Sequence, residues 1–288
     1  MATKDTQSKL KNFTPDPDIT PEALEEMRVE VMDRIITARI GLLLRHPFFG
    51  NMATRLKIVA ADEWLGTAAV DGRNLYYNTQ FFNAMNNKEI EFVVAHEILH
   101  MVFDHMGRRD DRDPMIYNIS ADYIVNNTLV RDRIGTIPSI VQCYQDFKYE
   151  GWTSEEVYDD VYEKAKEMGE EYLKQLGEML DEHLDSEDDG EGVSDGEVGK
   201  DVNGNATSKS KPKYSKEEVK QIKDEIKENM ISAAQSAGAG NVPGAVARMI
   251  KELTEPKMNW REIIRQSVQS SIRSDYTFSR PSRKGQMS

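Results

Sequence analysis

Apolar residues recur at helical spacing over most of the chain. The first such pattern covers residues 21–45, where Thr20 is placed as an N-cap and Pro21 as a first-turn proline. This pattern predicts one long amphipathic helix. Further helical patterns cover residues 88–108, 115–129, 154–180 and, with an Ala/Gly-rich interruption, 215–272. The chain is therefore predicted to be mostly helical.

A segment with strand character separates the first two helical patterns. Residues 55–60 alternate between apolar and polar, and residues 65–70 and 73–77 flank the dipeptide Asp71-Gly72. Asp-Gly between two short β-favouring runs is a strong hairpin signal, because both turn residues tolerate positive φ. The predicted fold class is α+β, a mostly helical domain with a small antiparallel sheet or hairpin before the helix that begins near residue 88.

Composition divides the chain into segments. Residues 1–20 are polar and rich in proline, which predicts a disordered N-terminal arm. Ten acidic residues and one lysine lie between residues 181 and 201, so residues 183–213 are predicted to form a disordered acidic linker. The remaining segments are expected to be a main domain at 21–182, a helical segment packing on it at 214–275, and a basic tail at 276–288.

Charge and cysteine content exclude several classes of protein. The chain of 288 residues has 37 lysines and arginines against 50 acidic residues, and the net charge of −13 argues against a nucleic-acid partner. Cys143 is the only cysteine, which excludes an intramolecular disulfide and a four-cysteine zinc module. No stretch has the character of a signal peptide or a membrane span, so we expect a cytoplasmic protein without a membrane partner.

One motif carries chemistry. His96-Glu97-Ile98-Leu99-His100 matches the His-Glu-x-x-His pattern and lies inside a strongly helical window. His96 and His100 are four residues apart, so both imidazoles project from one helix face and suit two adjacent ligand positions of a tetrahedral zinc ion. Glu97 is placed to accept a proton from a metal-activated water, which makes it the candidate catalytic base.

A third metal ligand must come from elsewhere in the chain. His105 would point away on a continuing helix, since nine residues at roughly 100° each turn it about 180° from His96. Asp122 is the better candidate, because Asn118, Asp122 and Asn126 share one polar face of the next predicted helix. We therefore expect His96, His100 and Asp122 to bind Zn²⁺, with Asn118, Asn126 and His105 orienting the ligands. His105 stays the alternative third ligand.

Several shorter motifs accompany this pattern. They resemble the metallopeptidase domain family that is found upstream of von Willebrand factor A-like domains in bacteria and phages. The resemblance covers roughly residues 25–285. It rests on Asp71-Gly72, Tyr76-Tyr77-Asn78, Ala95 to His100, His105, Arg108-Arg109, Asp113-Pro114, Tyr117 to Ile119, Ala121 to Asn126, Val242-Pro243-Gly244, Glu255-Pro256-Lys257 and Asn259 to Glu262.

The resemblance implies a zincin-like fold and a zinc-dependent hydrolase that cleaves a protein or peptide substrate. In that fold the strand before the metal-binding helix takes up the substrate backbone as an added strand, and Gly66–Val70 would be that strand here. The resemblance also implies a partner that is a von Willebrand A-like domain or an ATPase.

Two other functions fit the same residues. One is a non-catalytic adaptor or assembly protein that keeps a structural zinc site, in which Glu97 would be dispensable. The other is a DNA-associated metalloprotease of the SprT-like type, against which the net charge of −13 and the lack of a zinc ribbon both argue.

Overall fold

The computed structural model describes residues 13–141, 143–169, 198–200, 204, 206–238 and 240–254. It divides the chain into two compact units, Met1–Ala247 and Arg248–Ser288. The second unit is described only at residues 248–254, so the fold below is that of the first. The predicted basic tail and the acidic stretch at residues 183–197 lie outside the described residues.

The described chain begins in contact with the domain. The Phe13 ring meets the Phe81 ring edge-on at 5.4 Å between centroids. The Asp16 backbone N–H donates to Gln80 Oε1 at 2.7 Å. The predicted disordered arm at residues 1–20 is therefore wrong for residues 13–16, because one aromatic ring and one backbone amide anchor them.

Two helices open the fold. α1 (Pro21–Arg45) has the predicted bounds, and its N-cap Thr20 accepts a hydrogen bond from the Ala23 N–H. α2 (Pro47–Arg55) follows after one residue and folds back on α1. The two backbones touch at Gly50, where an added Cβ would lie 2.2 Å from Leu43 Cα. Glycine is the residue that permits this approach.

The apolar positions of α1 fall on two faces rather than one. Val31, Ile35, Ala38 and Leu42 are fully buried, as the pattern predicts. Ile36 and Leu43 are exposed, along with other apolar residues on the outer side of the helix. The prediction of a simple amphipathic helix is wrong in this respect.

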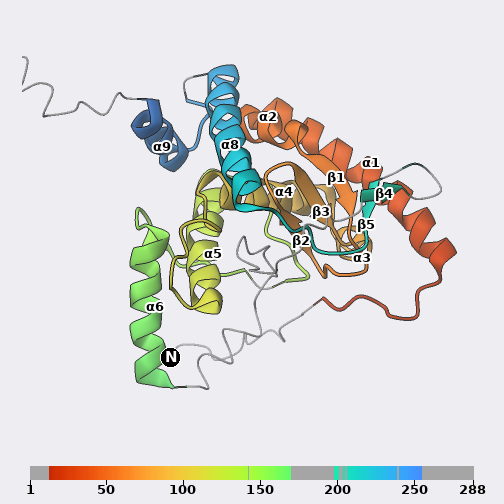
Figure 1. Ribbon diagram of the computed structural model, residues 1–288, viewed down its shortest axis with the longest axis horizontal. Coiled ribbons are helices and arrows are strands. Elements are labelled where there is room, and N and C mark those ends of the chain that lie inside the picture. The colour runs from red at the N-terminus through yellow and green to blue at the C-terminus, as the bar shows by residue number, and fades with distance from the viewer. Residues whose placement is uncertain are drawn as a thin grey trace, which may run out of the picture. The chain divides into compact units, whose positions relative to one another are not determined.

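A small sheet lies beside these helices (Figure 1). Its five strands have the order β2-β3-β1-β5-β4. The predicted hairpin is confirmed: β2 (Ala68–Val70) pairs antiparallel with β3 (Asn74–Tyr77) around Gly72, which has a φ of 97°. β1 (Lys57–Ala60) pairs parallel with both β3 and β5, so the sheet is mixed rather than purely antiparallel.

The other end of the sheet comes from a distant part of the sequence. β4 (Val198–Lys200) and β5 (Ala206–Ser208) pair antiparallel, and Ala60 of β1 lies opposite Thr207 of β5. These strands fall inside the predicted disordered linker at 183–213, so that prediction is wrong for them. The physical reason is that β1 offers an open edge of backbone N–H and C=O groups, which a short polar strand can satisfy.

Helices cover the rest of the domain (Figure 1). α3 (Thr79–Asn83) leads to α4 (Asn87–Val102) and α5 (Pro114–Arg131), and the 3₁₀ turn η1 (Phe147–Tyr149) precedes α6 (Ser154–Met168). α8 (Lys216–Ala237) packs on α2 and α4. α9 (Gly244–Thr254) ends the described chain. Among the described residues, no helix is long and apolar enough to cross a membrane.

α6 closes one side of the domain against α5. It begins with a capping box, in which the Thr153 side chain accepts from the Glu156 N–H and the Glu156 carboxylate accepts from the Thr153 N–H. One turn later Asp160 accepts hydrogen bonds from the Tyr149 hydroxyl at 2.6 Å and the Lys164 ammonium at 2.7 Å. These contacts join η1 to α6.

Candidate metal centre

α4 presents both histidines of the motif from the interior of the domain. The helix starts with a capping box between Asn86 and Glu89, and its residues from Glu89 to Val102 are buried. His96 and His100 therefore project from one face of a helix whose residues are buried. Glu97 lies between them and is only 2% exposed. Two imidazoles and a carboxylate are costly to bury without ionic or hydrogen-bonded partners.

α5 brings the third group. Asp113 caps this helix by accepting from the Ile116 N–H, and Pro114 starts its first turn. Asp122, two turns further along, is buried against α4. Its Oδ1 lies 3.1 Å from His100 Nε2 and 3.5 Å from His96 Nε2, and the two Nε2 atoms are 3.0 Å apart. The structure thus brings the three sequence-predicted ligands together as one buried His-His-Asp cluster.

Asn126 determines which nitrogen of His96 faces the cluster. Its side-chain N–H donates to the Tyr144 carbonyl oxygen at 3.0 Å, which leaves Oδ1 directed at His96 Nδ1, also at 3.0 Å. An amide oxygen can only accept, so His96 Nδ1 carries a hydrogen, and in the neutral imidazole Nε2 then holds the lone pair. This is the orienting role predicted for Asn126.

His105 determines which nitrogen of His100 faces the cluster, because the chain turns back on itself after α4. The Asp104 N–H donates to the Met101 carbonyl and the His105 N–H to the His100 carbonyl, with Asp104 at a φ of 51°. This is a Schellman motif, which ends the helix and reverses the chain. The expectation that His105 points away assumed a continuing helix and is wrong.

The reversed chain places His105 against the outer nitrogen of His100. The two Nδ1 atoms are 3.1 Å apart, and His105 Nε2 lies 2.8 Å from Ser154 Oγ. With His100 Nδ1 as donor, His105 accepts at Nδ1 and donates from Nε2 to Ser154, which leaves the His100 Nε2 lone pair directed at the cluster. His105 is therefore a neighbour of a ligand rather than a member of the cluster.

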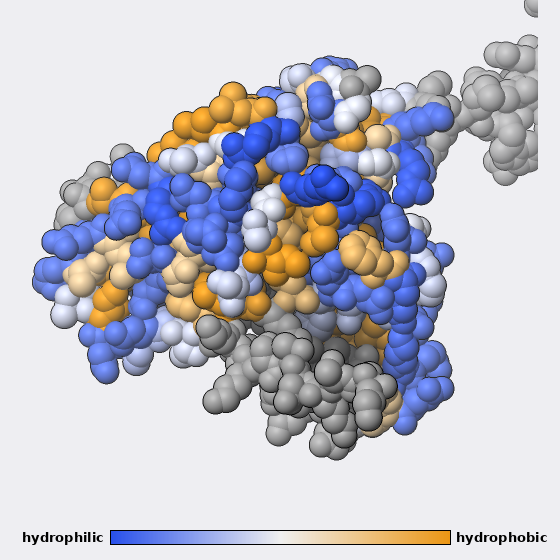
Figure 2. All heavy atoms as spheres, turned by 180° about the vertical axis from the view of Figure 1, so that it is seen from behind, coloured by the Kyte–Doolittle hydropathy of each residue, from blue (hydrophilic) through white to orange (hydrophobic). Residues whose placement is uncertain are grey.

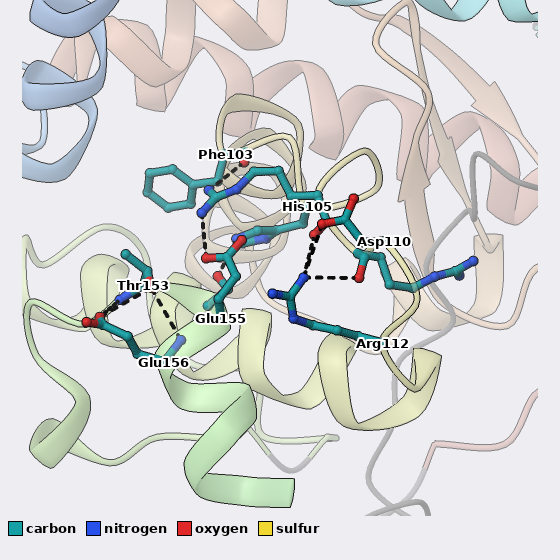
Figure 3. Close-up of polar contacts among 10 residues, drawn as sticks. Phe103, His105, Asp110, Arg112, Thr153, Glu155 and Glu156 are labelled. Atoms are coloured by element: carbon teal, nitrogen blue, oxygen red, sulfur yellow. Dashed lines mark hydrogen bonds and ion pairs between the residues drawn. The ribbon is translucent and has the colours of Figure 1, made fainter.

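Figure 3 shows the start of α6 near this turn, with Glu155 beside His105 and with Thr153 and Glu156 paired with each other further along. The Arg108 guanidinium donates to the Phe103 carbonyl at 3.1 Å and to Glu155 at 2.6 Å, so an ion pair holds the turn against α6. Sequence reasoning missed Ser154. The only local signal was the capping box that makes it the first residue of a helix.

Asn118 is the one predicted orienting residue without a hydrogen bond to the described residues of the site. It is half-buried on α5, and no hydrogen bond joins its side chain to another residue that the structure describes. It lies one turn before Asp122 on the same polar face, and its orienting role stays a prediction.

The donor set fits a divalent cation. Two imidazole lone pairs and one carboxylate oxygen converge within 3.0 to 3.5 Å, and without a cation between them these acceptor atoms repel one another. Ligand bonds of about 2.0–2.2 Å in a tetrahedral site separate ligand atoms by about 3.3–3.5 Å, close to the spacing observed here. A buried His₂-carboxylate set is also a recognised metal-binding combination.

Comparison with known proteins agrees with this site. Neither the curated proteins nor the solved structures include a match to the chain. A family model does match residues 31–286, which include all three residues of the cluster and the helices that carry them. The family is described as Putative metallopeptidase domain, a description that suits a buried His-His-Asp cluster. Since the match covers well over half of its length, the chain belongs to that family.

Proposed function

We propose that the protein is a zinc-dependent peptidase in which His96, His100 and Asp122 hold the metal and Glu97 is the catalytic base. The observation that carries the proposal is the convergence of the three ligand atoms within 3.5 Å in a buried site. Zn²⁺ bound there would polarise a peptide carbonyl and make water acidic enough to react near neutral pH.

The chain's own residues supply the proton transfers. Glu97 follows His96 on the same buried helix turn, a position that suits a general base for a water at the metal. It accepts the proton that the attacking water loses and then donates it to the nitrogen of the leaving amine. Asn126 and His105 would hold His96 and His100 in the orientation that a bound metal needs.

The sheet supports a place for the substrate. β2 is one of the two end strands of the described sheet, and it includes part of Gly66–Val70, the segment expected to take up a substrate strand. An extended peptide that adds to such an edge satisfies its own backbone hydrogen bonds and is held straight. We propose that a substrate peptide binds along this edge.

Zinc content and proteolysis, measured together, test the proposal. Wild type and Glu97→Gln are compared for bound zinc and for cleavage of unfolded casein, with Asp122→Ala as the ligand variant. Glu91→Gln is the matched control, since Glu91 is a buried glutamate of the same helix that pairs with Lys88 and Arg45 instead. Rates are divided by the folded fraction from circular dichroism.

The expected result is zinc in wild type, Glu97→Gln and Glu91→Gln, with cleavage lost only in Glu97→Gln, and neither zinc nor cleavage in Asp122→Ala. Zinc in wild type with no cleavage by any variant would favour the adaptor with a structural zinc site. Absence of stoichiometric metal from wild type purified without chelators would overturn the metal site itself.

A further inference from the structure

An ion pair joins α8 to the turn that follows α4. The Lys223 ammonium lies 3.3 Å from Oδ2 of Asp104, and Asp104 pairs with no other cation among the described residues. Asp104 is the residue at a φ of 51° that turns the chain from His100 back to His105. Hydrophilic side chains cover much of the face shown in Figure 2, and ion pairs on such surfaces usually contribute little. This pair differs because of the residue that it holds.

Gly107 leaves the space that the ion pair occupies. A Cβ added at this position would lie 1.8 Å from Lys223 Nζ and 2.6 and 2.8 Å from the two carboxylate oxygens of Asp104. The ammonium and the carboxylate therefore meet directly against the backbone of the turn, where the Gly107 N–H donates to the Asp104 carbonyl at 3.1 Å. A side chain at Gly107 would displace these charged groups from the turn.

Three distant parts of the domain hold this turn. Ser154 of α6 lies 2.8 Å from His105 Nε2, and Met106 packs against an apolar cluster of the sheet. Lys223 of α8 holds Asp104, the residue just before His105. Loss of the Lys223 charge should therefore affect the position of His105 more than the stability of the fold, because the other two contacts remain.

Contacts with the β2–β3 hairpin fix the position of α8 itself. Glu225 accepts two hydrogen bonds from the Arg73 guanidinium, at 2.9 and 2.6 Å. Ile222 lies so close to Gly72 that an added Cβ there would be 2.5 Å from its Cγ2. α8 also packs on α2 and α4. Lys223 therefore reaches the turn from a helix that is docked on several elements of the domain.

We propose that Lys223 is a positioning residue of the metal centre, which acts through Asp104 and His105 on His100. The proposal rests on the metal site of the proposed function. Lys223 holds Asp104 in the left-handed conformation, and this conformation places His105 Nδ1 3.1 Å from His100 Nδ1, the contact that orients His100 for a metal. Metal binding by the motif on α4 thus depends on a helix that follows the acidic stretch in the sequence.

Zinc affinity of the full chain, measured by competition with a chromophoric chelator, is the first test. Lys223→Met keeps a long side chain without its charge and should weaken zinc binding about two- to fivefold, the range of an exposed ion pair. Lys223→Arg should keep the wild-type affinity. Lys227→Met is the matched control, because Lys227 lies on the same helix and pairs with Asp224 instead. Salt at about 1 M should remove the difference, since it screens an exposed pair.

A double-variant cycle identifies the partner of Lys223. Asp104→Asn should weaken zinc binding as much as Lys223→Met does, and the two changes together should weaken it no more than either alone. The ring nitrogen chemical shifts of His100 and His105, measured on isotope-labelled, metal-free protein, report which nitrogens carry a hydrogen. Lys223→Met should change these shifts, and Lys227→Met should not.

Equal zinc affinity in wild type and Lys223→Met, or full additivity in the double variant, would overturn the proposal. If wild type binds no zinc, the proposed function fails, and the ring nitrogen shifts then decide whether Lys223 positions His105. Unchanged shifts in Lys223→Met would overturn the positioning role in that case.

Discussion

Asn126 links the metal centre to the fold through two hydrogen bonds, and one of them can be removed without the other. Its carbonyl oxygen accepts from His96 Nδ1, and its N–H donates to the Tyr144 carbonyl, both at 3.0 Å. Asn126→Ala removes both bonds. Asn126→Asp keeps an acceptor for His96 but has no N–H for Tyr144, so it should weaken the fold while sparing the metal site.

The expected magnitudes follow from these contacts. Loss of a group that orients a histidine ligand lowers metal affinity about 10- to 100-fold, or about 1.4–2.7 kcal/mol. A buried carbonyl left without its donor costs about 1–3 kcal/mol of unfolding free energy. Asn126→Ala should therefore show both losses. Asn126→Asp should show the loss of stability with zinc affinity within a few-fold of wild type.

Two measurements separate the effects. Zinc affinity is obtained by competition with a chromophoric chelator, and unfolding free energy by urea titration of metal-free protein. Asn118→Ala is the matched control, because Asn118 lies on the same face of α5 and makes no hydrogen bond to the described residues of the cluster. The reasoning is refuted if Asn126→Ala binds zinc as tightly as wild type, or if Asn118→Ala loses as much affinity.

Three further outcomes are expected. Ser154→Ala removes the acceptor for His105 and should lower zinc affinity by about tenfold in the same competition assay. An unchanged affinity would show that the hydrogen bonds from Ser154 through His105 to His100 do not affect metal binding. Burial raises the pKa of Asp160, but its hydrogen bonds outweigh this and hold that pKa well below its ordinary value, so its stabilising effect is present above about pH 4 and lost as the pH falls further. The Tm difference between wild type and Asp160→Asn should accordingly shrink between pH 5 and pH 2, and a constant difference would contradict the assignment. Gly50→Ala should cost about 2–3 kcal/mol in urea unfolding because its Cβ meets the backbone of α1, while Gly66→Ala, with open space around it, should cost little.

The sequence alone determined the features that depend only on interactions between residues close together in the chain. Four-residue spacing in a buried helix sends His96 and His100 to one face whatever surrounds them, because the helical repeat does not depend on distant contacts. The hairpin at Asp71-Gly72 was predictable for the same reason, since turn chemistry acts over four residues. The shared face of α5 also pointed to Asp122 before any contact was known.

Only the tertiary structure decided how those pieces meet. The crossing of α4 and α5 selects Asp122 for the cluster and Asn126 for His96, and periodicity alone cannot select among residues of one face. His105 reaches His100 because Asp104 takes a positive φ. The usual sequence signal for such a turn is a glycine, and this position has an aspartate. Ser154 and β5 arrive from far along the chain, and such contacts depend on packing and open strand edges, which no local pattern records.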